Sequence, residues 1–175
     1  TCILFGDGAG AVVLEPTEKY GIMDASLGID GTGGEFLYMP GGGSLNKTNK
    51  NTVEQKMHYV KQNGSSVFKS AIKGMYDVTK KIMDENNIKK EDIKLFIPHQ
   101  ANKRIIDSTV NKLGLKEKQV FININKYANT TAGSIPIALC EAVEKEILQQ
   151  GDKVILTAFG AGFTWGGLLI EWNYK

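Results

Sequence analysis

Two polar side chains in this sequence stand where they could act together on a carbonyl group. His99 follows the apolar run 93–98, and Asn129 opens a stretch of small polar residues, 129–134, after the apolar run 120–124. An imidazole N–H and an amide N–H can each donate a hydrogen bond. Because two donors aimed at one carbonyl oxygen stabilise the negative charge that develops there, this pair is suited to an oxyanion hole.

Each of these side chains also has a structural explanation when it is taken alone. A single histidine is more often a hydrogen-bonded core residue than a catalytic one, and small polar residues often cap a helix. In open α/β sheets, however, ligands bind outside the carboxyl ends of the strands. A third loop, Gly160–Gly162, follows the next apolar run. Three such strand ends together favour a functional site.

The other reactive side chains give weaker signals. His58 lies in the polar stretch KMHYVKQ and is expected at the surface. Cys2 starts an apolar run and Cys140 lies within a predicted helix, so we expect neither to be a nucleophile, and their spacing indicates no metal site. No acidic partner for His99 stands out, so a serine-hydrolase triad is not indicated. The loop GDGAG precedes a strand rather than a helix, so nucleotide binding is not expected.

The second part of the sequence alternates between helices and strands. The predicted order is helix, strand, helix, strand, helix, strand, strand, over residues 63–88, 93–97, 102–113, 120–124, 134–150, 153–159 and 166–172. The first helix has one apolar face, formed by Val67, Ala71, Met75, Val78 and Ile82. Ser65 or Ser66 can cap its start, while Gly114 and Gly151 end the next two helices. This alternation predicts an α/β fold with a mostly parallel sheet.

The first part of the sequence predicts a hairpin, a strand and a long loop. The runs CILF and AVVLE flank GDGAG, GIMDASLGI reads as a strand, and 31–52 is a loop of a length that is often functional. The segment ILFGDGAGAVVLE is echoed by ILTAFGAGFTWGGLLIE near the end. Glycine-rich hairpins can look alike by chance. The alternative is a duplicated fold, of which this chain holds the end of the first half and all of the second.

The composition bounds the function classes. The chain has 175 residues and a formal net charge of +2, which argues against a dedicated nucleic-acid binder. No apolar run approaches the ~20 residues that a membrane span needs. Two cysteines give no disulfide framework, so a reducing, intracellular setting is the simplest interpretation.

Four motifs carry a resemblance to a known family. LFGDGAGAVVLE, IPHQANKRIID, YANTTAGSIPIAL and AFGAGFTWGG resemble, in order, motifs of β-ketoacyl-acyl-carrier-protein synthase III. The similarity covers nearly the whole chain and is weakest over the stretch 31–61. The resemblance implies an α/β, thiolase-like fold built from two βαβαβαββ halves. Residues 1–62 would be the end of the first half, with its terminal hairpin and a connecting loop, and residues 63–175 the second half.

The resemblance also implies an activity, which is decarboxylative Claisen condensation of a short acyl-CoA such as acetyl-CoA with malonyl-ACP. The product is a 3-oxoacyl-ACP, and the reaction initiates type II fatty-acid synthesis. The family uses a Cys-His-Asn triad, in which His99 and Asn129 match the histidine and the asparagine. The cysteine would lie in the first half, so this chain alone is expected to be inactive. No cofactor or metal is expected, because acyl-CoA is a substrate.

Further positions receive roles from the same resemblance. The oxyanion loop would include Ala161 and Phe159, substrate-binding residues would be Gly64, Phe68, Ala101 and Asn102, and the acyl carrier protein would meet Lys69, Arg104 and Lys112. Asn111 replaces one basic residue of the family's patch. A homodimer is implied, in the cytoplasm or a plastid stroma, with no nucleic-acid or membrane partner. The alternatives are another thiolase-fold acyl-CoA condensing enzyme, such as a hydroxymethylglutaryl-CoA synthase, or a non-catalytic acyl-carrier or CoA-binding module.

Overall fold

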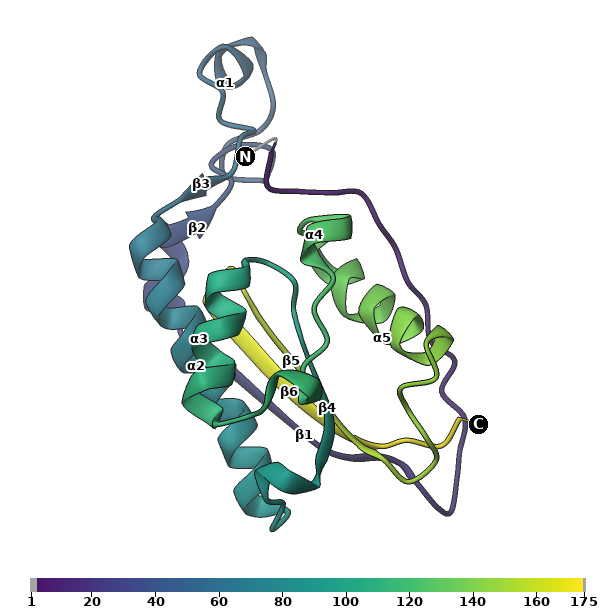
Figure 1. Ribbon diagram of the computed structural model, residues 1–175. Coiled ribbons are helices and arrows are strands. Elements are labelled where there is room, and N and C mark those ends of the chain that lie inside the picture. The colour runs from purple at the N-terminus through teal and green to yellow at the C-terminus, as the bar shows by residue number, and fades with distance from the viewer. Residues whose placement is uncertain (1–2, 175) are drawn as a thin grey trace.

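The computed structural model describes residues 3–174, and its centre is a four-stranded mixed sheet (Figure 1). The strands lie in the order β1 (Gly21–Ile29), β6 (Thr164–Glu171), β5 (Lys153–Gly160) and β4 (Ile93–Pro98). β4 and β5 are parallel, whereas β6 is antiparallel to both β5 and β1. The α/β architecture predicted from the sequence is therefore confirmed. The expectation of a mostly parallel sheet is wrong, because two of the three strand pairings are antiparallel.

Helices cover both faces of this sheet (Figure 1). Helices α2 (Gly64–Glu85) and α3 (Lys103–Leu113) lie on one face, and α5 (Ser134–Glu144) lies on the other. Successive residues of β4 point to opposite sides: Phe96 joins the core beneath α2, while Leu95 joins the core beneath α5. A strand that is buried on both faces is mainly apolar, and in β4 only Lys94 is exposed. This explains why the run before His99 has no polar alternation.

Helix α2 buries the apolar face that its periodicity predicted. All five of its predicted inward residues are buried: Val67, Ala71, Met75, Val78 and Ile82. The cap differs from the prediction, because Oδ1 of Asn63 accepts the N–H of Ser66 and the two serines cap nothing. Asparagine is among the strongest N-caps, since its short side chain reaches back to the first free N–H groups.

Helix α3 has the predicted ends. Asn102 is its N-cap, and Gly114 terminates it in the left-handed conformation, with φ at 69°. The helix after it is shorter than predicted, because α5 stops near Lys145 instead of continuing to Gln150. Glu146 takes a positive φ of 54°, and the N–H of Ile147 bonds back to Ala142. This closing turn usually carries glycine, so a glutamate at this position does not predict it.

The long segment between β1 and α2 contains short elements of its own. Its Gly- and Asn-rich part holds the 3₁₀ turn η1 (Gly31–Phe36), β2 (Leu37–Tyr38), α1 (Lys50–Glu54) and β3 (Lys61–Gln62). β2 and β3 form a separate two-stranded sheet.

The remaining short elements lie after α2 in the chain. They are η2 (Lys90–Asp92), η3 (Glu117–Gln119), α4 (Ile124–Tyr127) and η4 (Thr131–Gly133).

Two predicted strand features are wrong. The hairpin expected within residues 2–15 does not form between residues 3 and 15, where the only strand-like pairing joins Phe5 to Asn129. The strand expected at 120–124 is reduced to one bridge between Val120 and Phe96, after which α4 begins. A strand needs a neighbour for its N–H and C=O groups, and apolar composition alone does not supply one. Cys2 lies outside the described residues.

The structure also shows where β1 belongs. It lies within residues 1–62, the segment predicted to end the first half of the fold, but it pairs along its length with β6. It therefore completes the sheet that β4 and β5 build. The division of the chain between residues 62 and 63 stays a prediction.

Candidate active site

His99 lies immediately beyond the carboxyl end of β4. Its backbone N–H donates to the carbonyl of Thr157 on β5 over 2.8 Å, so the parallel pairing continues one residue past Pro98. The side chain is half-buried, and its Nδ1 lies 2.6 Å from Oγ of Ser134, the first residue of α5. Burial lowers the pKa of His99 below its usual value. The ring is therefore neutral near pH 7.

Gln100 links the end of β4 to the start of α4. Its side chain is buried, with 1% exposed. Nε2 donates to the carbonyls of Pro98 and Phe121, and Oε1 accepts the N–H groups of Asn123 and Ile124. Four hydrogen bonds from one buried amide fix the strand end beside His99. Gln100 had no predicted role, although a polar residue so close to the end of a buried strand was a usable signal.

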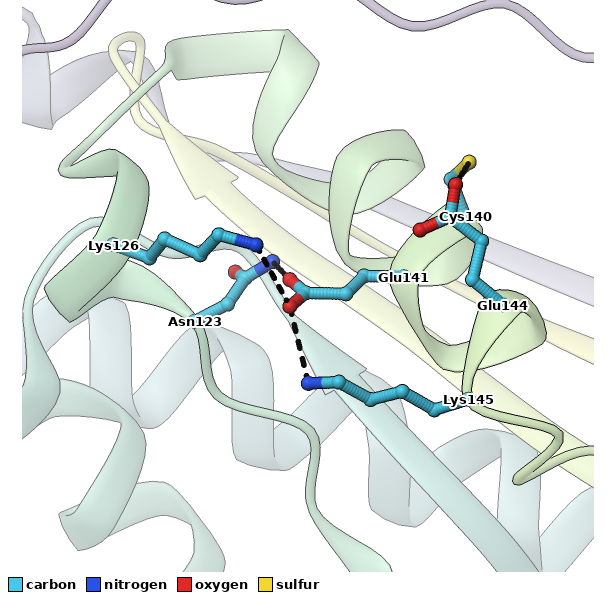
Figure 2. A network of polar contacts seen from close by, with 6 residues as sticks. All are labelled: Asn123, Lys126, Cys140, Glu141, Glu144 and Lys145. Atoms are coloured by element: carbon cyan, nitrogen blue, oxygen red, sulfur yellow. Dashed lines mark hydrogen bonds and ion pairs between the residues drawn. The ribbon is translucent and has the colours of Figure 1, made fainter.

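A charged network joins α4 to α5 (Figure 2). Oε2 of Glu141 accepts Nδ2 of Asn123 at 2.9 Å, and Oε1 accepts Nζ of Lys126 at 3.2 Å and of Lys145 at 3.0 Å. The hydrogen bonds from Asn123 and then from Lys145 lower the pKa of Glu141 to about 2. Because Asn123 also donates its N–H to Gln100, this network continues to the residue beside His99.

Asn129 lies in the loop between α4 and η4. Its side chain is half-buried, and Oδ1 accepts the N–H of Thr131 at 2.9 Å. That bond holds the acceptor end of the amide in the loop, which leaves the Nδ2 donors for another partner. The loop then runs through η4 to Ser134, the residue that contacts His99. No hydrogen bond joins the side chains of His99 and Asn129 within residues 3–174, and the contact of His99 with this part of the chain is made through Ser134.

A glycine-rich segment packs against the Asn129 loop. A Cβ on Gly6 would lie 2.2 Å from the carbonyl oxygen of Tyr127, and one on Gly8 would lie 2.7 Å from the side chain of Ile137. A Cβ on Gly10 would meet Pro136 at 2.5 Å. The glycines of GDGAG therefore allow close contact with α4 and α5. This is a packing reason for the motif, consistent with the expectation that it is not a nucleotide loop.

The third loop follows β5 at the same edge of the sheet. Phe159 is 9% exposed and packs against Phe163, with ring centroids 4.9 Å apart, whereas Ala161 is exposed in the turn to β6. The backbone of Phe163 exchanges two hydrogen bonds with Asp30, at 2.6 and 2.8 Å. The loop is therefore held between the sheet and the end of β1.

The predicted substrate-binding residues lie at the starts of α2 and α3. Gly64 is exposed at the first position of α2, and a Cβ there would have no described atom within 4 Å. Phe68 and Ala101 are half-buried, and Asn102 is exposed while its Oδ1 caps α3. These residues lie at or near the starts of α2 and α3, and Ala101 and Asn102 follow His99 after the single residue Gln100.

The three predicted basic residues lie exposed on α2 and α3. The guanidinium of Arg104 lies 5.4 Å from the ring centre of Phe68, and Nζ of Lys112 lies 3.9 Å from that of Tyr76. The two contacts are eight residues apart on α2 and eight residues apart on α3, in the same order along both helices. The helices therefore run side by side in the same direction. Lys69 follows Phe68 on the exposed face. Asn111, the expected gap in the patch, is exposed as well.

Neither of the other reactive side chains lies at this site. His58 is exposed and stacks edge-on against Tyr59. Cys140 is exposed on α5, where the negative charge of Glu144 raises the pKa of its thiol. Figure 2 shows Cys140 directed toward Glu144, away from the network of Asn123 and Glu141. A raised pKa disfavours the thiolate, which agrees with the expectation that Cys140 is not the nucleophile.

Residues 3–174 lack the features of two other kinds of site. None of their helices combines the length and apolar character that a membrane span requires. They contain no cluster of three or more His, Cys, Asp or Glu residues that could hold a metal ion.

Two family descriptions match the chain. The one described as 3-oxoacyl-[acyl-carrier-protein] synthase III C terminal matches residues 83–172, and the one described as 3-oxoacyl-[acyl-carrier-protein] synthase III matches residues 1–31. A β-ketoacyl-[acyl-carrier-protein] synthase III of Koribacter versatilis is 51% identical over 99% of the chain and 53% of that protein. One from Chlorobium phaeobacteroides is 50% identical over 99% of the chain and 54% of that protein. The chain thus spans about half the length of these relatives.

Solved structures of the same kind resemble the chain in three dimensions. A 3-oxoacyl-[acyl-carrier-protein] synthase III from Aquifex aeolicus has a TM-score of 0.85 at 38% identity, and covers 98% of this chain and 51% of its own. A synthase III from Thermus thermophilus has a TM-score of 0.81 at 37% identity, and covers 100% of this chain and 54% of its own. The thiolase-like α/β fold expected from the sequence is confirmed.

Proposed function

Because the chain belongs to the 3-oxoacyl-[acyl-carrier-protein] synthase III family, we propose that it supplies the condensing half of such an enzyme's active site. The proposed reaction joins a short acyl-CoA to malonyl-ACP, releases CO₂, and yields 3-oxoacyl-ACP. The observation that supports it best is the placement of His99, neutral and half-buried at the end of β4. The loop of Asn129 is tied to it through Ser134.

The first step proposed is acylation of a cysteine thiolate. The thiolate attacks the carbonyl carbon of the acyl-CoA thioester, and the C–S bond to coenzyme A breaks, so that CoA leaves as a thiolate and takes a proton from water. We assign this nucleophile to neither Cys140 nor Cys2. The thiol of Cys140 has a raised pKa and lies apart from His99. The backbone N–H of Ala161, in the exposed turn after β5, is proposed as one donor to the oxyanion of acyl transfer.

The second step proposed is decarboxylation of the malonyl thioester. The bond between C2 and the carboxylate breaks, CO₂ leaves, and the electron pair becomes an enolate on the thioester oxygen. His99 and Asn129 would each donate one N–H to that oxygen. A neutral imidazole can donate without first losing or gaining a proton. Because these hydrogen bonds strengthen as negative charge develops, they lower the barrier of this step.

The third step proposed forms the new carbon–carbon bond. C2 of the enolate attacks the carbonyl carbon of the acyl-cysteine, and the thiolate leaves as the tetrahedral intermediate collapses. The product is 3-oxoacyl-ACP and the free thiolate is regenerated. The reaction needs no oxidant or reductant, so no cofactor is proposed.

The carrier protein is proposed to dock on the exposed face of α2 and α3. Lys69, Arg104 and Lys112 lie on this face, and aromatic rings of α2 hold the last two in position. Exposed cations that face an acidic partner act mainly on the rate of encounter and on its salt dependence. The open space at Gly64 is proposed to admit the pantetheine arm between carrier and site. A homodimer and a cytoplasmic setting are further parts of this proposal.

The test is an assay of the protein expressed from its complete gene. The protein is incubated with acetyl-CoA and malonyl-ACP, and mass spectrometry of the carrier protein follows acetoacetyl-ACP. We expect product in the wild type and in His58→Ala, because His58 is exposed and has no proposed role in the site. His99→Ala should form much less product. Absence of product with acetyl-CoA and with every other short acyl-CoA would contradict the proposed function.

A further inference from the structure

The hydroxyl of Ser134 has an unusually restricted environment. Ser134 is 2% exposed at the first position of α5. Its Oγ accepts the backbone N–H of Gln100 at 3.2 Å and lies 2.6 Å from Nδ1 of His99. Within the described chain, no other group contacts this hydroxyl at hydrogen-bonding distance. Its single hydrogen therefore has one available partner, which is the imidazole ring.

The position of that hydrogen decides the tautomer of His99. If Nδ1 carried the ring proton, it would donate to Oγ, and the hydroxyl hydrogen would be buried without an acceptor. An unsatisfied buried donor is costly, whereas donation from Oγ to Nδ1 satisfies both groups. We propose that Ser134 is a positioning residue for the reaction, because its hydroxyl donates to Nδ1 of His99 and holds the ring as the tautomer with its proton on Nε2.

This tautomer makes Nε2 of His99 a hydrogen-bond donor toward a substrate. With Nδ1 occupied by Ser134, Nε2 is the ring nitrogen that remains for a substrate, and it presents an N–H. The opposite tautomer would present a lone pair to a carbonyl oxygen and repel it. The inference therefore rests on the proposed function for its consequence, although the tautomer itself is a property of the protein alone. The lowered pKa of His99 agrees with a neutral ring that accepts at Nδ1.

The direct test is ¹⁵N NMR of ring-labelled histidine in the protein expressed from its complete gene. His99→Gln identifies the signals of His99, and the spectra distinguish protonated from unprotonated ring nitrogens near pH 7. We expect the wild type to carry its proton on Nε2 and Ser134→Ala to show a mixture of both tautomers. Ser134→Thr keeps the hydroxyl and should restore the wild-type pattern. Ser26→Ala, at a buried serine on the far edge strand β1, is the matched control.

Kinetics supply the second readout. In Ser134→Ala the ring of His99 is no longer held in the tautomer that donates from Nε2. This should lower kcat for condensation by about tenfold and leave acylation by acetyl-CoA unchanged. Ser134→Thr and Ser26→Ala should condense at rates close to the wild type.

Two results would overturn the proposal. One is a wild-type His99 with its proton on Nδ1, a result that needs no variant and holds even if Ser134→Ala fails to fold. The other is an unchanged tautomer in folded Ser134→Ala. If the tautomer behaves as expected but the wild type forms no 3-oxoacyl-ACP, the proposed function fails and the assignment of Ser134 stands.

Discussion

The backbone of Asn129 pairs with that of Phe5 in a single parallel bridge. The N–H of Asn129 donates to the carbonyl of Leu4 at 3.1 Å, and the N–H of Gly6 donates to the carbonyl of Asn129 at 3.0 Å. Asn129, the proposed second donor of the oxyanion hole, is therefore held by a segment near the start of the sequence. This pairing makes the glycine-rich segment part of the architecture of the site.

Replacing Gly6 should disturb the site without touching a catalytic group. In Gly6→Ala the new Cβ would lie 2.2 Å from the carbonyl oxygen of Tyr127, so the backbone must move and carry Asn129 with it. A displacement of about 1 Å can cost roughly 100-fold in rate, and we expect a loss of that order in condensation. Gly43→Ala is the control, because a Cβ there has no described atom within 4 Å. Equal activity in both variants would show that the bridge does not position Asn129.

Replacing Gly64 should affect substrate binding but not folding. A Cβ at this first position of α2 meets open space, and alanine in a helix costs less conformational entropy than glycine. Gly64→Ala should therefore unfold at the same or a slightly higher temperature than the wild type. If the pantetheine arm passes here, KM for acetyl-CoA should rise several-fold. An unchanged KM for both acetyl-CoA and malonyl-ACP would place the channel elsewhere.

Removing Arg104 should weaken docking of the carrier protein. We expect Arg104→Ala to raise KM for malonyl-ACP by about threefold to tenfold, to reduce its dependence on salt, and to leave KM for acetyl-CoA unchanged. The control is Lys89→Ala, which removes an exposed cation beyond the other end of α2. The patch would be assigned wrongly if Lys89→Ala affected malonyl-ACP as strongly as Arg104→Ala.

The hydrogen bonds and ion pairs of Glu141 should make the free energy of unfolding depend on pH. Because the pKa of Glu141 is lowered to about 2 from a usual value near 4.5, the unfolded chain takes up its proton first. The stabilisation is therefore complete above about pH 4.5 and is lost as the pH falls toward about 2. Glu141→Gln should cost about 2 kcal/mol near pH 7 and progressively less in acid.

Urea unfolding at a series of pH values measures this effect. Glu144→Gln is the matched control, since it removes an exposed carboxylate from the same helix. We expect the stability curve of Glu144→Gln to run parallel to that of the wild type, and the curve of Glu141→Gln to converge on it at low pH. Parallel curves for all three proteins would mean that the network does not hold Glu141 charged.

His99 adds a second pH effect in a different window. Burial lowers its pKa, so the unfolded chain binds a proton that the folded chain excludes. Protonation of His99 therefore leaves the free energy of unfolding unchanged above the usual histidine pKa, about 6.5. Below that pH the free energy of unfolding falls until the pH reaches the lowered pKa of the folded state. A neutral ring near pH 7 is also the state in which Ser134 can donate to Nδ1.

Much of the fold could be predicted because local signals agreed with tertiary needs. The helical period placed the buried face of α2 correctly, and Gly114 marked the end of α3. The run before His99 indicated a buried strand, because a strand covered on both faces is mainly apolar. His99 was therefore expected at the carboxyl edge of the sheet, and it lies there.

Other features depend on partners that a sequence does not reveal. In the apolar run at 120–124 only Val120 forms a strand bridge, and the carbonyl of Phe121 accepts from the side chain of Gln100 instead of from a neighbouring strand. One bridge and then α4 therefore replace the predicted strand. Glu146 ends α5 in a conformation that favours glycine, and only the packing of the following turn selects it. Three of the four hydrogen bonds of Gln100 join segments far apart in the chain. Such long-range contacts cannot be deduced from spacing.

The most direct test of the account follows the two half-reactions in one experiment. Intact-mass spectrometry is applied to the wild type and His99→Ala, both expressed from the complete gene, after acetyl-CoA and again after malonyl-ACP. We predict an acetyl-sized increase in both proteins. After malonyl-ACP, the wild type should lose the acetyl group, whereas His99→Ala should keep it with turnover about 10²–10³-fold slower. An unacetylated His99→Ala, or one that is deacetylated as fast as the wild type, would contradict the role proposed for His99.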